Sequence, residues 1–262
     1  MNGTRRSKSL VTLAAGLALG VLAAGPVRAE LTAKANHDHI TVDFLYHGST
    51  VGVRGIADPD ADLIVKIAAA DGHEVLKEKG KKAGFLWMNV GTLEFGHTPK
   101  LYEVHSTRPV EELLPDEEAD RFVLGYPALA RHVAIEPLES EQEKARWFGE
   151  FVKFKEDSNL YATSTGKISF SEKGGRREYY INTPWPHQAP PGDYLATVYA
   201  VKNGRVVETA ESRVKVEQVG GVRYLAAMAK NRGALYGLLS IISALGAGFG
   251  VGLVFRKGGG AH

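Results

Sequence analysis

The sequence predicts a mainly β protein: an immunoglobulin-like β-sandwich with a helical insertion, followed by one C-terminal transmembrane helix. Alternating apolar and polar residues recur through both halves of residues 30–217 and predict the strands of the sandwich. A helical pattern interrupts these strands at about residues 110–157 and predicts the insertion. An uncharged apolar run at residues 233–255 predicts the membrane helix.

Strands are expected at the start of the sandwich region. Residues 38–56 alternate on both sides of a central turn and predict a strand pair. The dipeptide Asp71-Gly72 follows another alternating segment and predicts a hairpin turn. Two more strands are expected around residues 85–89 and 102–106. The side chains of these two strands that we expect to point inward are Trp87, Tyr102 and Val104.

The pattern changes at Pro109, where the helical insertion is expected to begin. Residues 110–134 are rich in Leu, Ala and Glu and predict short helices. A longer helix follows, with a capping box formed by Ser140 and Glu143. Arg108, just before the change, is expected to fasten the chain by hydrogen bonds. The apolar face of the longer helix, which we expect to dock on the sandwich, contains Trp147, Phe148, Phe151, Val152 and Phe154.

Two hairpins are expected in the second half of the sandwich. One turns at Lys173 and the two glycines after it. The other turns at Asn203-Gly204, which suits a type I′ turn because both central residues need a positive φ. A Pro-Pro-Gly-Asp-Tyr run ends at Tyr194, just before a strand, and this is the sequence form of a tyrosine corner. Two smaller β-domains joined by helices are the alternative arrangement.

Residues 233–255 are long enough to cross a membrane. At about 1.5 Å per residue this helix reaches about 34 Å, compared with a hydrocarbon core of about 30 Å. Basic residues flank both ends, Lys230 and Arg232 before the run and Arg256 and Lys257 after it. The positive-inside rule therefore does not orient the helix.

Residues 1–29 predict the orientation of the chain. They carry basic residues, a short apolar run and small residues before Glu30, which is the plan of a secretory signal peptide; an uncleaved anchor helix is the alternative. Export leaves residues 256–262 as a cytoplasmic tail and makes residues 218–232 a juxtamembrane linker. Since the exported part has no Asn-x-Ser/Thr site, we expect a single-pass protein of a bacterial inner membrane with its bulk in the periplasm.

Composition excludes several functions. Cysteine is absent, which excludes disulfides and thiolate metal sites. The 32 basic and 30 acidic residues form no dense basic stripe, so no nucleic-acid partner is expected. There is no G-x-S-x-G motif, and the Ser-x-x-Lys match of Ser164 and Lys167 stands in a strand-like segment, outside the setting that gives the motif meaning. We therefore expect neither an enzyme nor a cofactor.

Histidines are the candidates for a metal site. Two of them, His37 and His39, are two residues apart and would point the same way on a strand. Neutral imidazoles suit both copper and zinc. Because no recognisable ligand motif is present, we expect histidines at strand ends and in loops and no bound metal, with a metal site as the alternative. The candidate ligands are His37, His39, His47, His97 and His105.

The membrane helix carries a face of small residues. Gly246 and Gly250 are four residues apart, the spacing that lets two membrane helices approach closely. We predict a contact with a second copy or with a helix of another membrane protein, and an inert anchor is the alternative. The residues predicted to make this contact are Ser240, Ala244, Gly246, Ala247 and Gly250.

Four motifs, taken in order, carry a family resemblance: "FLWMN" at 85–89, "YEVHSTRP" at 102–109, "PPGDYLATVYAVKNGRVV" at 190–207, and "LYGLLS" at the start of the membrane run. The chain resembles a family described from alphaproteobacteria as putative transmembrane proteins, over nearly the whole mature length. This resemblance implies exported single-span proteins, often associated with permeases of the sulfite-exporter type. It brings no catalytic residues.

Two functions are consistent with these observations. The first is a membrane-anchored periplasmic accessory or interaction protein, with a sulfite-exporter-type transporter as the partner that the resemblance implies. The alternative is a periplasmic module that binds copper or zinc. The metal content of the exported part and its membrane partners would distinguish the two.

Overall fold

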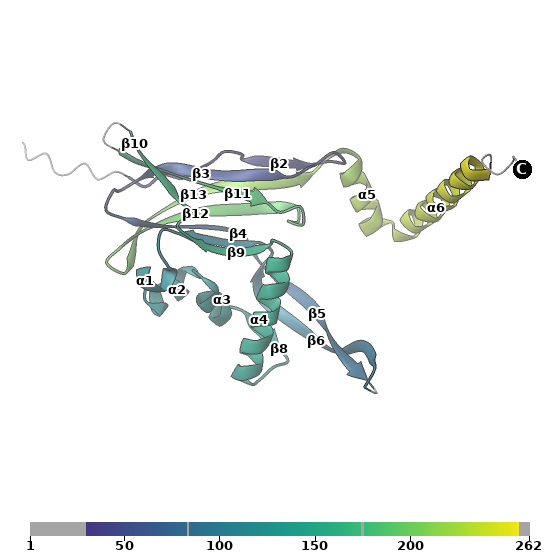
Figure 1. Ribbon diagram of the computed structural model, residues 1–262, viewed down its shortest axis with the longest axis horizontal. Helices are drawn as coiled ribbons and strands as arrows, with labels where there is room; N and C mark the ends of the chain where they lie inside the picture. Colours follow the sequence, from purple (N-terminus) through teal and green to yellow (C-terminus); the bar gives the residue numbers. More distant parts are fainter. Residues whose placement is uncertain (1–29, 83, 174–175, 257–262) are drawn as a thin grey trace, which may run out of the picture.

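The computed structural model describes residues 30–82, 84–173 and 176–256. The described chain is mainly β, with three sheets and one long apolar helix at its C-terminal end (Figure 1). The predicted signal peptide, residues 1–29, lies outside the described residues, as do residues 257–262 of the predicted tail.

Two of the sheets pack face to face. The four-stranded sheet has the order β1 (Lys34–Ala35), β3 (Ser49–Ala57), β11 (Arg176–Trp185) and β10 (Ser169–Lys173). The six-stranded sheet has the order β2 (His39–Val42), β13 (Arg205–Gln218), β12 (Gly192–Lys202), β4 (Asp62–Ala69), β7 (Tyr102–Ser106) and β9 (Tyr161–Thr165). Its two edge strands are parallel to their neighbours, β2 to β13 and β9 to β7.

One hydrophobic core fills the space between these two sheets. It includes Val53 from β3, Leu63 from β4 and Val198 from β12, none of which is exposed. Strands from the two halves of the chain pair directly, β3 with β11 and β4 with β12. The β strands that form this core are therefore one unit, and the alternative of two smaller β-domains is wrong.

A third layer covers the outer face of the six-stranded sheet. It consists of α1 (Val110–Leu113), α2 (Asp116–Phe122), α3 (Tyr126–His132), α4 (Glu141–Asp157) and a three-stranded sheet of β5 (Asp71–Lys82), β6 (Leu86–Pro99) and β8 (Ala134–Glu136). A second core joins this layer to the sheet, with Tyr102 and Tyr161 from the sheet against Phe151 of α4. Helices α1 to α4 lie within residues 110–157, the segment in which the helical insertion was predicted.

Both predicted hairpins of the second half are present. β10 pairs with β11, and β12 pairs with β13 around Asn203 and Gly204, whose φ angles are 50° and 74° as a type I′ turn requires. The Tyr194 hydroxyl donates a hydrogen bond to the Pro190 carbonyl, the contact predicted for a tyrosine corner. The Tyr194 ring also packs edge-on against Trp185, with centroids 4.7 Å apart.

The predicted strand pair at residues 38–56 is wrong. β2 and β3 lie in different sheets, and β2 ends at Val42, before Phe44 and Tyr46, which were expected to continue it. The cause is a turn at Asp43, whose side chain accepts a hydrogen bond from the Leu45 N–H and whose carbonyl accepts one from the Tyr46 N–H.

The predicted hairpin turn at Asp71-Gly72 is also wrong, because both residues begin β5 and pair with β6. β4 is a central strand with β12 on one side and β7 on the other, so no edge is left for β5. Its apolar residues are buried on both faces, as Leu63 and Ile64 show. The chain therefore leaves the six-stranded sheet after Ala69 and starts the third sheet.

Three expectations about side chains need correction. Trp87 points outward and is 64% exposed, whereas Tyr102 and Val104 are buried as predicted. Ser140 does stand at the start of α4, but its side chain makes no capping hydrogen bond, so the capping box with Glu143 is absent. The docking face of α4 is correct except for one residue, because Phe154 is 51% exposed.

The predicted linker, residues 218–232, contains helix α5 (Gly220–Asn231), and α6 (Gly233–Arg256) follows it. The backbone breaks the helix at Arg232, where φ is −139° and ψ is 53°. In Figure 1, α5 and α6 extend away from the β-rich body beyond the end of β13. Residues 233–253 of α6 are long and apolar enough to cross a membrane.

Candidate functional site

The five histidines proposed as metal ligands do not come together. His37, His39, His47 and His97 are exposed and His105 is buried. His39 contacts Glu217 (Nε2–Oε2 3.3 Å), and His47 lies at a separate open pocket of about 770 Å³ that also contains His187 and Trp185. Within residues 30–82, 84–173 and 176–256, no group of three or more metal-ligating side chains is arranged to hold a metal ion.

One of the five, His97, does meet another histidine, His132, which the sequence analysis did not single out. The rings of His97 and His132 are 5.8 Å apart, and His132 Nε2 is 2.6 Å from Asp71 Oδ2. The β6 backbone makes this possible because His97 has a positive φ of 57°, at a register shift in the β5–β6 ladder. The pair joins α3 to the base of the third sheet.

His105 belongs to a buried polar chain between the two large sheets. Its Nδ1 atom is 2.6 Å from Ser164 Oγ on β9, and its Nε2 atom is 3.3 Å from Glu103 Oε2. The Thr183 hydroxyl, on β11 of the opposite sheet, donates to the same Glu103 oxygen at 2.8 Å. Glu103 and His105 are 3% and 2% exposed. All four groups are satisfied if Nε2 carries the proton and Nδ1 accepts from Ser164.

A serine, a histidine and a carboxyl group linked by hydrogen bonds in this order are also the groups of the catalytic triad of nucleophilic catalysis. Here the histidine and the carboxyl group lie inside the sandwich, and the chain of hydrogen bonds ends on Thr183 of the other sheet. Both ring nitrogens of His105 are engaged, which also occupies the positions that a metal ion would need. We interpret this polar chain as a link between the sheets.

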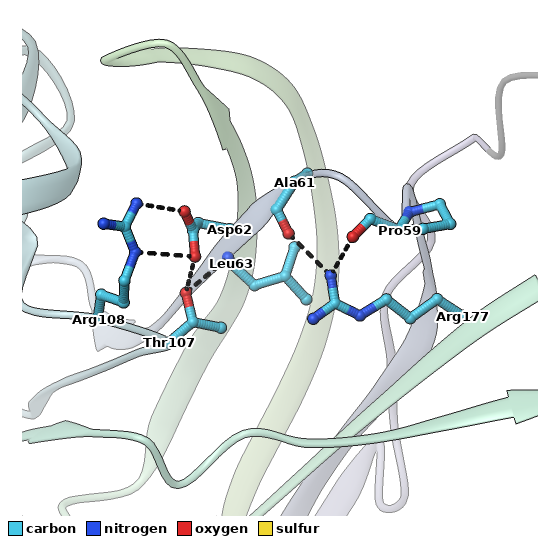
Figure 2. A network of polar contacts seen from close by, with 7 residues as sticks. All are labelled: Pro59, Ala61, Asp62, Leu63, Thr107, Arg108 and Arg177. Atoms are coloured by element: carbon cyan, nitrogen blue, oxygen red, sulfur yellow. Dashed lines mark hydrogen bonds and ion pairs between the residues drawn. The ribbon is translucent and has the colours of Figure 1, made fainter.

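Arg108 makes the hydrogen bonds that its position predicted. Figure 2 shows its guanidinium facing Asp62, with Nη2 2.7 Å from Oδ2. Asp62 also accepts from the Thr107 hydroxyl at 2.8 Å. The pKa of Asp62 is lowered, first by the hydrogen bond from Arg108. Nearby, Arg177 of β11 donates to the Pro59 and Ala61 carbonyls, so the turn before β4 is held from both sides (Figure 2).

A half-buried lysine lies against the helical layer. The Lys66 ammonium donates to the Phe122 carbonyl at 2.5 Å and lies 5.7 Å from the centre of the Tyr199 ring, beside a pocket of about 340 Å³. Burial lowers the pKa of Lys66 to about 8, although Asp71 and Glu211 act in the opposite direction. The folded protein therefore keeps a costly positive charge at neutral pH.

We expect Lys66→Met to raise the free energy of unfolding by about 2 kcal/mol at pH 7, since one pKa unit corresponds to about 1.4 kcal/mol and the Phe122 carbonyl loses a donor. The pKa of Lys66 is lower in the folded state than in the unfolded state. Its destabilising effect is therefore complete below pH 8 and disappears as the pH rises from about 8 to about 10.5. Unfolding at pH 7 and at pH 10 measures both effects, with the exposed Lys167→Met as the matched control. An equal gain at both pH values would contradict the assignment.

The end of the β5–β6 hairpin exposes large apolar side chains to solvent. Phe85 is 79% exposed, Trp87 64% and Leu86 54%. We define the hairpin tip as residues 85–88. The sequence analysis placed Trp87 at an inward position of a strand, but alternation along a strand does not show whether another layer covers it.

The small-residue face of α6 is uncovered in the single chain. No atom lies within 4 Å of a Cβ placed on Gly246 or Gly250. The Ser240 hydroxyl donates to the Tyr236 carbonyl one turn earlier, so it is satisfied within the helix. The helix–helix contact of these residues stays a prediction.

A comparison with protein families decides what the chain is related to. The family described as "Putative transmembrane protein (Alph_Pro_TM)" matches residues 30–257. The chain belongs to this family. No curated protein matches the chain in a sequence search. The Alph_Pro_TM match covers the β-rich body, the helical layer, α5 and the whole of α6.

Proposed function

We propose that this Alph_Pro_TM protein is a membrane-anchored accessory protein that associates through α6 with another inner-membrane protein or with a second copy. The observation that carries the proposal is α6 itself. Its span of 21 residues, Gly233–Leu253, is apolar, and none of these residues is buried against the rest of the described chain. A helix of this kind is stable in a bilayer and offers its whole surface to lipid or to other helices.

The orientation belongs to the same proposal. The signal peptide predicted at residues 1–29 would deliver the β-rich body to the periplasm and leave only a short tail in the cytoplasm. The partner implied by the family resemblance is a permease of the sulfite-exporter type.

We further propose that the two large sheets form an immunoglobulin-like sandwich. The strand order supports this: each sheet holds strands from both ends of the chain, and β2 lies parallel to the last strand, β13. The hydrogen bond from Tyr194 to Pro190 supports it as well. Such sandwiches serve many proteins as rigid binding modules, so the fold fits an interaction protein.

An interaction role also fits the buried polar groups. The Ser164–His105–Glu103 chain links the two sheets through Thr183, and its buried residues, His105 and Glu103, are not presented at the surface. The proposal therefore assigns no enzyme activity. No arrangement of histidines within the described residues favours the copper or zinc alternative.

We expect the double variant Gly246→Leu, Gly250→Leu to weaken association by at least tenfold. Leucine at both positions would keep a neighbouring helix away from the backbone, and close backbone approach is what packing between membrane helices depends on. Crosslinking in native membranes, followed by co-purification in mild detergent, measures the association of the full chain.

The matched control is Leu238→Phe, Leu245→Phe. These residues are seven apart and lie on the side of α6 opposite the middle of the small-residue face, so they add bulk without touching that face. Complexes that survive the glycine variant as well as they survive the control would remove α6 as the contact.

A further inference from the structure

The distal half of the β5–β6 hairpin is a two-stranded arm with no covering layer. β8 pairs with β6 only at residues 94–96, near the base of the hairpin. Between Leu86 and Val90, on the tip side of Gly91, β6 has no buried residue. Leu86, Met88 and Val90 are 54%, 39% and 45% exposed. A two-stranded ribbon with apolar side chains in water is marginally stable on its own. This half of the hairpin therefore needs a surface to cover it.

The base of the same hairpin is firmly held. Phe95 of β6 stacks on Phe151 of α4, with ring centres 4.5 Å apart and planes inclined by 15°. Glu74 of β5 pairs with the buried Lys155 of α4. A fixed base and an uncovered tip make the hairpin an arm that presents residues 85–88 at a set distance from the body (Figure 1).

Charge limits what the arm can contact. Residues 77–90 contain four lysines, Lys77, Lys79, Lys81 and Lys82, and one acidic residue, Glu78. The Lys81 ammonium lies 5.2 Å from the centre of the Trp87 ring. An exposed tryptophan and apolar tip, flanked by lysines on flexible stems, is the combination favoured at the boundary between lipid headgroups and acyl chains. Lysines near such a surface are attracted to anionic headgroups.

The arm and the anchor both leave the body on the right-hand side of the view in Figure 1, where the hairpin points down and to the right from the lower layer and α5 and α6 leave from the end of the sheets above it. Because α6 is tethered in the bilayer, contact of the tip with that bilayer is an intramolecular event with a high effective concentration. A tip with weak affinity for lipid is therefore sufficient.

We propose that the hairpin tip, residues 85–88, inserts into the interfacial zone of the bilayer that α6 spans, with the lysines of β5 on anionic headgroups. The body then has two points of attachment to the membrane, α6 and the arm, which fix its tilt. This inference rests on α6 lying in the bilayer and does not depend on the partner of α6.

The test uses the full chain, whose lack of cysteine makes any introduced cysteine unique. Phe85→Cys is labelled with an environment-sensitive NBD fluorophore and the protein is reconstituted in vesicles of phosphatidylcholine with phosphatidylglycerol. The control is Val207→Cys, which is 40% exposed and lies near the start of β13, the end of that strand away from α5. We expect at least a twofold higher emission from the label at 85, and quenching by lipids that carry a nitroxide near the headgroup.

Charge reversal tests the second half of the proposal. Lys79→Glu, Lys81→Glu and Lys82→Glu together should reduce the quenching at least twofold, as should vesicles of phosphatidylcholine alone. Equal quenching in both vesicle types would overturn the role of the lysines. A label at position 85 whose emission and quenching match those of the label at position 207 would overturn insertion. Emission from position 85 that rises in native membranes but not in lipid vesicles would mean that the tip contacts a protein instead. Flotation of both labelled proteins with the vesicles shows that α6 is still anchored, so a failed arm is distinguishable from a failed anchor.

Discussion

Replacing Gly55 by alanine is expected to lower the free energy of unfolding by about 3 kcal/mol. A Cβ at this position would lie 1.8 Å from the Thr32 carbonyl oxygen and 2.8 Å from the Tyr179 hydroxyl oxygen. Neither is the free end of a flexible side chain, because the first is backbone and the second is buried and donates to Thr32 at 2.6 Å. The chain before β1 must therefore move away from β3.

That movement breaks several hydrogen bonds at once. The Thr32 N–H donates to the Ile56 carbonyl at 3.0 Å, and the Ile56 N–H donates to the Thr32 hydroxyl at 2.8 Å. Tyr179 would lose its acceptor inside the core, and an unsatisfied buried hydroxyl costs about 1–3 kcal/mol. The packing of this edge of the four-stranded sheet therefore depends on Gly55 having no side chain.

Gly149→Ala is the matched control for Gly55→Ala. It lies inside α4, and no atom is within 4 Å of the added Cβ. Alanine is the better helix former, so this variant should be more stable by about 1 kcal/mol. Urea unfolding of the full chain in detergent, followed by the fluorescence of the buried Trp185, measures both. A loss for Gly55→Ala no larger than about 0.5 kcal/mol, the size typical of a surface substitution, would contradict the close approach at Thr32.

Local patterns in the sequence predicted local structure well. The β12–β13 hairpin follows from Asn203-Gly204 and the alternation around it, because turn and strands are neighbours in the chain. The pairing of β2 with β13 was not predicted, since its partner is the last strand of the body and no local pattern records it. Asp71-Gly72 shows the converse error: a good turn dipeptide stands where the chain changes sheets.

Parts of the candidate site had signals in the sequence that were not used. Lys66 interrupts the apolar run of β4, which already suggested a strand buried on both faces. Glu103 and His105 alternate with Tyr102 and Val104, so if one set points to one core, the other set must point to the opposite side of the sheet. What no pattern revealed is that both sides of β7 are covered. Ser164 and Thr183, which complete the polar chain, come from strands brought in by the tertiary fold.

The buried polar chain is expected to give the largest effect of a single substitution. We expect Glu103→Ala to lower the free energy of unfolding by about 4 kcal/mol, within the range for breaking a buried ionic or hydrogen-bonded pair. The change leaves His105 Nε2 and the Thr183 hydroxyl without their shared acceptor and opens a cavity between the sheets. Urea unfolding of the full chain, as for Gly55, measures the loss.

Glu103→Gln separates the role of hydrogen bonding from that of volume. The amide oxygen can take the place of Glu103 Oε2 and still accept from both the Thr183 hydroxyl and the His105 Nε2–H. We therefore expect a loss of only about 1 kcal/mol for Glu103→Gln. If Glu103→Ala were no more damaging than Glu103→Gln, the link across the sandwich would not depend on Glu103, and hydrophobic packing alone would hold the two sheets together.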